Sequence, residues 1–560
     1  MKPSQLICPL CQDKVDKLVY RFHYDSEQAV LEKIRREFPE WTKQDGLCSR
    51  CVDFFRSEIL MEQRVLPAIG PHFPIKTADD FIVIPTGLRL NADPRFTGKG
   101  VTICFIDSGF YPYPDLVATK NRIKKMVDLG QNENALCFGE VRKDSFGGLA
   151  EVSSRWHGTM TSVICAGDGY LSKGLYKGIA CEAELVLLKV QDPQEKITAL
   201  NIARALKWVL ENHVEFNIRI VNISLGSDEN ISYKESEVDD LAEQLIKKGI
   251  VVVAAVGNDP NSAIKPPANS INVIAVGGID DQNVVEGNAN RLYHSSFGKT
   301  IDDLMKPELT AHAMWIAAPI LPETNAQREA ETLYHLLETT HGELVEELKN
   351  FSSVVDLDRS VYELQDAESI RSKILQRIRQ CKYISPHYMH VDGTSFAAPI
   401  VTAVVAQLLE INPELTPLEI RTLIFSTAKR IDNLPSEPQG YGLIQPRKAI
   451  LKALKRQVNV KSNQSPDVDP EKKTIGFYVE HECASQITLA GSFNQWADDV
   501  LYMEAGKNGL WHLEIPMLPA GRYQYKFFVD DKTWIEDFDN PYREPDGFSG
   551  FNSILIVKPN

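Results

Sequence analysis

Residues 101–109 have the sequence VTICFIDSG, an apolar and β-branched run that ends on Asp107, Ser108 and Gly109. A continuous apolar run of this length is typical of a strand buried on both faces. Four similar runs follow, at residues 185–190, 218–223, 250–256 and 271–276. The segments between them carry apolar residues at helical spacing, as at Leu206 and Leu210. Strands that alternate with helices predict an α/β fold, with a parallel sheet covered by helices on both faces.

The length, composition and charge of the chain exclude several classes of protein. The chain has 560 residues, 43% of them hydrophobic and 24% charged, which indicates several globular domains rather than one. Its net charge of −15 argues against nucleic acid as a partner, because that binding needs clustered Lys and Arg. The longest apolar runs fall short of the roughly 18–20 residues that span a bilayer, so no membrane partner is expected. The N-terminus lacks the pattern of a secretory signal, and the ten cysteines suit a reducing compartment, so we expect a cytoplasmic protein.

We expect four segments along the chain. Residues 1–65 hold two Cys-x-x-Cys pairs around a charged helical stretch, and residues 66–458 form the α/β domain. Residues 459–472, which include SPDVDPEK, have the Pro-containing and charged composition of a linker. Residues 473–560 contain short alternating runs between turns, which predict an all-β sandwich of immunoglobulin type. Within the α/β domain, residues 325–381 predict a helical insertion, either packed on the body or acting as a lid or a partner-docking arm.

Three polar residues stand where an open parallel sheet places its functional sites, beyond the carboxyl ends of strands. Asp107 ends the first run, His157 opens a helical stretch in the motif WHGT, and Ser395 lies in GTSFAAP before an apolar helix. A serine hydroxyl needs a histidine to take its proton and a buried carboxylate to orient that histidine. Asn258, just beyond an apolar strand, and the backbone N–H of Ser395 are candidate donors to an oxyanion.

The order Asp, His, Asn, Ser and the motifs DSG, HGT, AAVGN and GTSFAAP resemble those of the subtilisin family of serine peptidases, over about residues 95–320 and 388–455. The resemblance implies a subtilisin-like fold and a serine endopeptidase that hydrolyses protein or peptide substrates. It assigns the roles of triad carboxylate, base, nucleophile and oxyanion donor to Asp107, His157, Ser395 and Asn258. It also assigns binding of the substrate backbone to Ser224, Leu225 and Gly226.

Departures from the family pattern lie next to these residues. Phe396 stands where the family commonly has Met, and Trp156 where it commonly has Gly. We expect both to change the shape of the cleft rather than the chemistry. The run Pro114-Asp115-Leu116 resembles a position that binds calcium in some relatives, so calcium is a candidate cofactor with its remaining ligands unmatched.

Two C-x-x-C pairs near the N-terminus predict a metal site. They consist of Cys8, Cys11, Cys48 and Cys51. Four thiolates at this spacing are typical of a closed, tetrahedral, structural zinc site. Accidental turns or a redox dithiol are the alternatives, although neither pair lies in the strand-to-helix context that redox motifs use.

The C-terminal motifs LAGSFNQW, AGRYQYKFFVDDKTW and GFNSILIV resemble the glycogen- and starch-binding sandwich of AMP-activated kinase β subunits and branching enzymes. The resemblance assigns contacts with an α-glucan to Trp496, Lys526, Trp534 and Asn552. A purely structural sandwich with core tryptophans is the alternative. For the whole chain, the rival to a glucan-tethered endopeptidase is a catalytically silent scaffold that keeps the fold and binds glucan.

Overall fold

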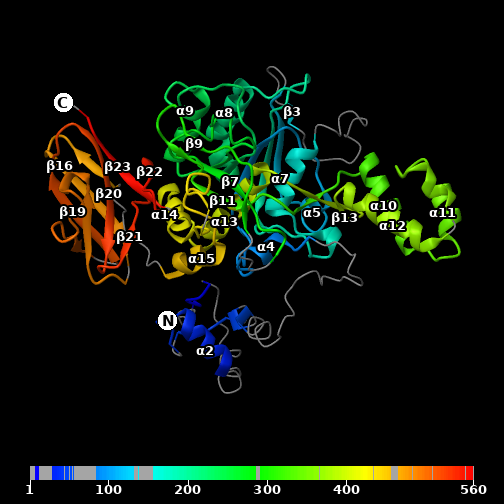
Figure 1. Cartoon of the computed structure of the whole chain (residues 1–560), viewed down its shortest axis with the longest axis horizontal. Helices are drawn as coiled ribbons and strands as arrows, with labels where there is room; N and C mark the ends of the chain where they lie inside the picture. Colours follow the sequence, from blue (N-terminus) through cyan, green and yellow to red (C-terminus); the bar gives the residue numbers. More distant parts are fainter. Residues whose placement is uncertain are drawn as a thin grey trace.

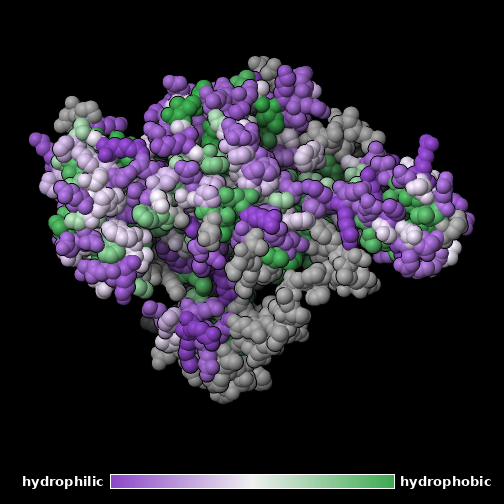
Figure 2. Space-filling model, in the orientation of Figure 1, coloured by the Kyte–Doolittle hydropathy of each residue, from purple (hydrophilic) through white to green (hydrophobic). Residues whose placement is uncertain are grey.

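The computed structural model of the chain describes most of its length. The described residues are 7–11, 28–42, 45–48, 51–52, 54–55, 83–130, 136–137, 155–284, 290–364, 366–432, 434–455, 465–481, 483–506, 509–548 and 550–558. Figure 1 shows a central α/β domain with the sandwich on the left, a helical arm on the right and the N-terminal segment below. Hydrophilic residues cover most of the face in Figure 2, with hydrophobic residues scattered among them.

A mainly parallel sheet forms the centre of the α/β domain, which confirms the predicted fold class. Its strands lie in the order β11-β7-β6-β5-β1-β4-β2-β3, with β8 paired to β7. The bounds are β1 Thr102–Asp107, β2 Ile123–Asp128, β3 Leu136–Cys137, β4 Glu184–Lys189, β5 Ile218–Ile223, β6 Val251–Ala255, β7 Ile274–Asp280, β8 Arg291–Leu292 and β11 Leu309–His312. The run expected at 271–276 becomes a strand only at Ile274, and the ammonium group of Lys306 binds the carbonyl oxygens of Ser270 and Val273 just before it.

Helices cover both faces of this sheet. The helix α13, Thr394–Ile411, packs against β5, β6, β7 and β11 and against α7, Trp156–Ala166. The helices α8, Ala199–Phe216, and α9, Glu237–Lys247, share a second apolar core with the sheet. Among the described helices, α13 alone has the length and apolar composition of a membrane span, but 83% of it is buried inside the domain. It is the core helix of this domain, as a helix apolar on all sides indicates.

The helical arm in Figure 1 comprises the residues of the predicted insertion. Its helices are α10 Asn325–Glu338, α11 Leu344–Asn350 and α12 Ala367–Gln380. These helices share an apolar core of their own, which includes Leu333, Ile370 and Ile374. A three-stranded sheet joins the arm to the body, and its strands are β12 Ile316–Pro319, β13 Tyr383–Ser385 and β14 Tyr388–Val391. The chain therefore runs from the arm through β14 directly into α13.

Two antiparallel sheets form the C-terminal sandwich. Their orders are β15-β16-β19-β18 and β17-β20-β23-β22, with β21 paired to β20. The bounds are β15 Asp467–Asp469, β16 Thr474–Glu480, β17 Ile487–Gly491, β18 Glu504–Ala505, β19 Leu510–Pro516, β20 Gly521–Val529, β21 Thr533–Ile535, β22 Arg543–Pro545 and β23 Phe551–Val557. Within the predicted linker 459–472, Val468 pairs with Ile475, so this part is a strand of the sandwich rather than a linker. Residues 459–464 of that linker lie outside the described residues.

The sandwich packs directly on the α/β domain. Arg543 of β22 donates a hydrogen bond to the carbonyl oxygen of Pro307 at 2.8 Å, and its guanidinium group lies 4.0 Å from the ring centre of Tyr441. Glu536 pairs with Arg430 at 2.5 Å. Since Arg543 and Glu536 are both buried, the two domains are joined by a desolvated contact and not by the chain alone.

The N-terminal segment also contacts the α/β domain. Its helix α2, Gln28–Glu37, ends on a carboxylate that pairs at 3.0 Å with Arg447 of α15, Pro446–Lys455. The buried guanidinium group of Arg95 lies 4.4 Å from the ring centre of Phe54. These contacts attach the cysteine-containing segment to the domain.

Candidate active site

Asp107 and His157 form the first half of the site. Asp107 is the last residue of β1 and is fully buried, while His157 lies in the first turn of α7. Its Nδ1 lies 2.7 Å from Oδ1 of Asp107. Thr161, one turn along α7, donates a hydrogen bond to Oδ2 of Asp107 at 3.1 Å. Gly158 permits this approach, because a Cβ there would lie 2.3 Å from the carbonyl oxygen of Gly109. The carboxylate thus orients the imidazole and leaves Nε2 to take a proton.

The environment of His157 sets its proton affinity. Burial lowers the pKa of His157, but the charge of Asp107 and its hydrogen bond outweigh burial and raise that pKa above its ordinary value. A general base must be neutral to act, so a protonated His157 could not serve as one. The raised pKa places this protonation at a higher pH than for an isolated histidine.

We therefore expect kcat/KM to fall with decreasing pH through the raised pKa of His157. In Asp107→Asn the negative charge is lost, so the pKa of His157 falls and the acid limb moves to lower pH, with a large drop in the plateau rate. A pH profile of kcat/KM for both proteins measures this shift. An acid limb at the same pH in both proteins would contradict the assigned pair.

Ser395 lies in the first turn of α13, next to the end of β5. Its Oγ donates a hydrogen bond to the carbonyl oxygen of Ser224 at 3.1 Å, and Oγ of Ser224 donates to the carbonyl oxygen of Ser395 at 2.8 Å. The ring of Phe396 lies 5.6 Å from the imidazole of His157, between ring centres. In this rotamer the Ser395 hydroxyl is bonded to Ser224 rather than to His157. Hydrogen bonds between a catalytic serine and its base are often poorly aligned until substrate is bound.

Asn258 is held with its amide nitrogen turned away from Thr394. Both the backbone N–H and the hydroxyl of Thr394 donate to Oδ1 of Asn258, at 2.9 and 2.8 Å. Two donors on the oxygen fix the orientation of the amide, because a flipped amide would place its NH₂ against them. Nδ2 is therefore presented beside Ser395, and both residues line the same pocket.

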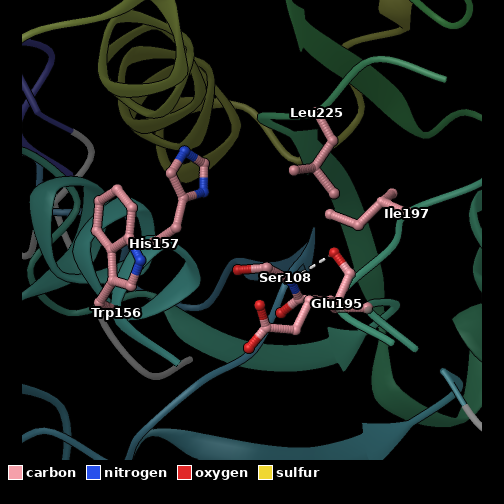
Figure 3. Close-up of a pocket in the computed structure, with 7 residues that line it drawn as sticks. Ser108, Trp156, His157, Glu195, Ile197 and Leu225 are labelled. Carbon is pink, nitrogen blue, oxygen red and sulfur yellow. Dashed lines mark hydrogen bonds between the residues drawn. The ribbon is translucent and has the colours of Figure 1, made fainter. Parts of the chain in front are cut away.

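The cleft has two hollows, each of about 400 Å³, that share Leu225 in their walls. Figure 3 shows the first, with His157 and Trp156 on one side and Ile197 and Leu225 on the other. The second is lined by the stretch 224–226 together with Asn258 and Ser395. The predicted substrate-binding residues Ser224, Leu225 and Gly226 thus lie beside Ser395.

A buried polar chain behind Ser224 was missed by sequence reasoning. The hydroxyl of Thr402 donates to Oδ1 of Asn222 at 2.9 Å, and Nδ2 of Asn222 donates to Oγ of Ser224 at 3.0 Å. These hydrogen bonds connect α13 to the end of β5, and Ser224 in turn contacts Ser395. The sequence did contain a signal for this network, because Asn222 places an amide inside the apolar run 218–223, and a buried amide needs hydrogen-bond partners.

Comparison with known proteins identifies the family. The model described as "Subtilase family" matches residues 98–442, which is more than half of the chain. The chain belongs to the subtilase family. A second model, described as "Glycogen recognition site of AMP-activated protein kinase", matches residues 478–560. This subtilase thus carries, at its C-terminal end, a module similar to the glycogen recognition site of AMP-activated protein kinase.

The subtilase is similar to characterised members of the family. It is 28% identical to "Serine protease AprX" of Bacillus subtilis over 337 residues, which are 59% of this chain and 61% of AprX. It is 28% identical to "Subtilisin BL" of Lederbergia lenta over 207 residues, 37% of this chain and 63% of that protein. The chain therefore spans about three-fifths of each of these two relatives. Among solved structures, sphericase matches with a TM-score of 0.43 at 19% identity, covering 65% of this chain and 98% of sphericase. Fervidolysin from Fervidobacterium pennivorans matches with a TM-score of 0.44 at 18% identity, covering 77% of this chain and 52% of fervidolysin.

The four N-terminal cysteines of this subtilase form a compact group. The sulfur atoms of Cys8, Cys11, Cys48 and Cys51 all lie within 4.8 Å of one another and are buried. Four sulfurs around one zinc ion at about 2.3 Å require this kind of spacing, so the donor set fits zinc. Arg95 donates to Sγ of Cys51 at 3.6 Å, which offsets part of the negative charge that four thiolates would carry.

The predicted calcium position does not fit that ion. Asp115, in α5, Pro114–Val117, is fully buried, and burial raises the pKa of its carboxyl group. Its oxygens accept hydrogen bonds from the hydroxyl of Tyr388 at 2.5 Å and from the N–H of Leu171 at 3.1 Å. Calcium needs six to eight oxygen ligands around it, whereas Asp115 is surrounded by donors. No step of the function is assigned to calcium.

The predicted glucan-binding residues meet on the outer face of the sheet that contains β20. The ring of Trp534 stacks on Phe528 at 4.4 Å and meets Trp496 edge-on at 6.2 Å, between ring centres. Trp534 is 41% exposed, so it is not a core residue. Asn552 lies next to Ser553, which pairs with Tyr525, and this register puts Asn552 opposite Lys526.

Lys526 is held in place by a neighbouring loop. Its ammonium group pairs with Asp546, and burial of its side chain is nearly complete. The loop of Asp546 also carries Phe548, which is 90% exposed and which sequence reasoning missed. An aromatic ring this exposed, in the loop that holds Lys526, adds apolar surface to this part of the sandwich.

Proposed function

We propose that this subtilase is a cytoplasmic serine endopeptidase with Asp107, His157 and Ser395 as its triad. The observation that carries the proposal is the 2.7 Å contact between buried Asp107 and His157, in a hollow that shares Leu225 with the hollow of Ser395. Ser395 Oγ attacks the carbonyl carbon of the scissile peptide bond and passes its proton to Nε2 of His157. His157 then returns that proton to the leaving amine, and water hydrolyses the acyl-enzyme by the same route.

Asn258 and the backbone N–H of Ser395 are the proposed donors to the oxyanion. The orientation of the Asn258 amide supports this role, because its oxygen already accepts hydrogen bonds from Thr394 and its NH₂ group is left to donate. Donors fixed before the reaction cost no reorganisation when the charge develops. The extended substrate would bind along the stretch 224–226.

A fluorophosphonate probe tests the proposal directly, because only an activated serine is labelled. We expect the full chain to be labelled at Ser395, and the Ser395→Ala variant to be unlabelled. A folded wild-type chain that is neither labelled nor active on peptides would favour the rival, a catalytically silent glucan-binding scaffold.

We also propose that the sandwich tethers the protease to an α-glucan such as glycogen. The exposed face of Trp534 would cover the C–H face of a glucose ring, while Lys526 and Asn552 would bind hydroxyl groups. Tethering would raise the local concentration of protein substrates on the same particle, without any change in the peptidase reaction.

Trp534→Ala should weaken glucan binding about ten- to hundredfold. An aromatic contact of this size contributes about 1.5–3 kcal/mol, and each 1.4 kcal/mol is about tenfold in affinity. Co-sedimentation with glycogen measures the loss, with Tyr170→Ala as a control, because its ring is 54% exposed on the α/β domain instead. Wild-type protein that stays in the supernatant would remove the tether and leave the protease assignment standing.

The four-cysteine group is proposed to hold one structural zinc ion. Four thiolates close the coordination sphere, so the ion would stabilise the fold of the N-terminal segment and take no part in hydrolysis. Metal analysis should find one zinc per chain in the wild type and a loss of zinc in Cys48→Ser. The matched control is Cys483→Ser, which changes an exposed free thiol in the sandwich. Equal zinc content in all three proteins would contradict the site.

A further inference from the structure

The hollow beside Ser395 contains a lysine that the catalytic chemistry does not use. Lys265 lines this hollow together with Asn258, Ser395 and Gly226. A Cβ built on Gly226 would lie 3.9 Å from the Cβ of Lys265, so the base of the lysine side chain lies directly beside the stretch 224–226. Sequence reasoning did not single out this residue.

The geometry of the reaction decides which substrate side chain enters this hollow. The scissile carbonyl must lie between Ser395 Oγ and Asn258 Nδ2, and both residues line the hollow. The Cα of the same substrate residue is bonded to that carbonyl carbon. Its side chain is therefore the one that reaches the hollow, whereas the hollow on the His157 side contains neither Ser395 nor Asn258.

The charge of the hollow is set by Lys265 and Asp259. Among the described residues, no carboxylate oxygen lies within 4 Å of the Lys265 ammonium group. Asp259, the one acidic residue in this lining, accepts hydrogen bonds from Oγ of Ser262 at 2.7 Å and from the N–H of Asn261 at 2.9 Å. Asp259 is exposed to water and accepts hydrogen bonds within its own loop. Solvent and these donors therefore reduce the electrostatic effect of its carboxylate on the hollow.

The rest of the lining is mostly small and carries no charge, and it includes the hydroxyl-bearing residues Ser262 and Ser296. Ala255, Val256, Gly257 and Ala263 leave room for a side chain of medium length and offer it no acidic partner. Lys265 is partly buried, so a neutral substrate side chain that displaces water from the hollow would leave its ammonium group without an opposite charge. A basic side chain would add repulsion. A carboxylate would pair with the ammonium group through a charge-assisted hydrogen bond.

We propose that Lys265 makes this protease selective for peptides with an acidic residue, Glu or Asp, on the amino side of the cleaved bond. The proposal rests on the proposed peptidase function and names its substrate class. Lys265 acts as a specificity residue: it contacts the substrate side chain and takes no part in bond breaking.

The test uses the full-length protein and peptides that differ only at the residue before the cleaved bond, which is Glu, Gln or Lys. We expect kcat/KM for Glu to exceed that for Gln by about tenfold, or about 1.4 kcal/mol. The Glu-to-Gln ratio should fall to about one in Lys265→Gln, and Lys265→Glu should shift preference toward Lys. Asp259→Asn should raise the ratio, because it removes the opposing charge. High salt should lower the ratio in the wild type.

Lys247→Gln is the matched control, since it removes an exposed lysine of α9 that lines neither hollow, and it should keep the wild-type ratio. A fluorophosphonate-labelled wild type that cleaves the Glu and Gln peptides equally well would overturn the selectivity and leave the proposed function intact. An unchanged ratio in Lys265→Gln would also overturn it. Absence of both labelling and cleavage would overturn the proposed function, and the selectivity with it.

Discussion

Ser395→Ala and His157→Ala should each remove nearly all peptidase activity. The two side chains act as one unit, because without the base the hydroxyl keeps its proton and without the hydroxyl the base has nothing to activate. In subtilisin, itself a member of this family, such a loss amounts to about 10⁶-fold in kcat. The double variant should therefore be only slightly less active than either single variant.

The measurement is kcat for a peptide substrate, with fluorophosphonate labelling of the same samples. Ser352→Ala is a suitable control, because it removes an exposed hydroxyl in the helical insertion. Losses that add up in the double variant would mean that Ser395 and His157 act independently, and substantial turnover in Ser395→Ala would remove the nucleophile assignment altogether. The present rotamer, in which Ser395 bonds to Ser224, makes this the decisive experiment.

Asn258→Ala should lower kcat by about 10²–10³, a magnitude measured on subtilisin for removal of its oxyanion-hole asparagine. The effect should fall on kcat more than on KM, because the charge that Nδ2 stabilises exists only in the transition state. Asn261→Ala, in the same loop but outside the hollow, is the matched control. A change confined to KM would show that Asn258 binds substrate and does not stabilise the oxyanion.

Thr394 offers a second check of the same idea. Its N–H and hydroxyl both bond to Oδ1 of Asn258, so the hydroxyl is one of two supports of the amide orientation. In Thr394→Val the backbone support remains, and we expect a loss in kcat smaller than that of Asn258→Ala. The smaller loss would mark Thr394 as a positioning residue.

The strand and the helix that carry Asp107 and Ser395 could be predicted from the sequence, because the hydrophobic pattern of each one specifies it locally. The run at 101–109 is apolar up to a terminal carboxylate, and it forms the buried strand β1 that ends on Asp107. The helix of Ser395 is apolar on all sides, and it forms the buried core helix α13. Asn222 could have been found in the same way, since it interrupts an apolar strand with an amide that needs partners.

Other features could not be predicted because they depend on residues far apart in the chain. The segment that contains β15 has the composition of a linker, but its backbone pairs with β16 and its Ser465 donates to Asp537, 72 residues away. The docking of the sandwich rests on Arg543 and Arg430, whose surroundings come from two domains. From sequence alone, a charged side chain is expected to be exposed to solvent, because such residues are rarely buried unless the fold pairs them with a partner.

By itself, then, the sequence determined the strand and helix order of the catalytic domain and the types of residue at the ends of its strands, because hydrophobic periodicity and short motifs are local properties. Only the tertiary structure decided which way the Asn258 amide is turned, which way Ser395 turns, and that Lys265 and Ser395 line the same hollow. Those outcomes depend on distances between side chains carried by separate loops and helices. Such distances are fixed by packing of the whole domain, which no stretch of sequence encodes alone.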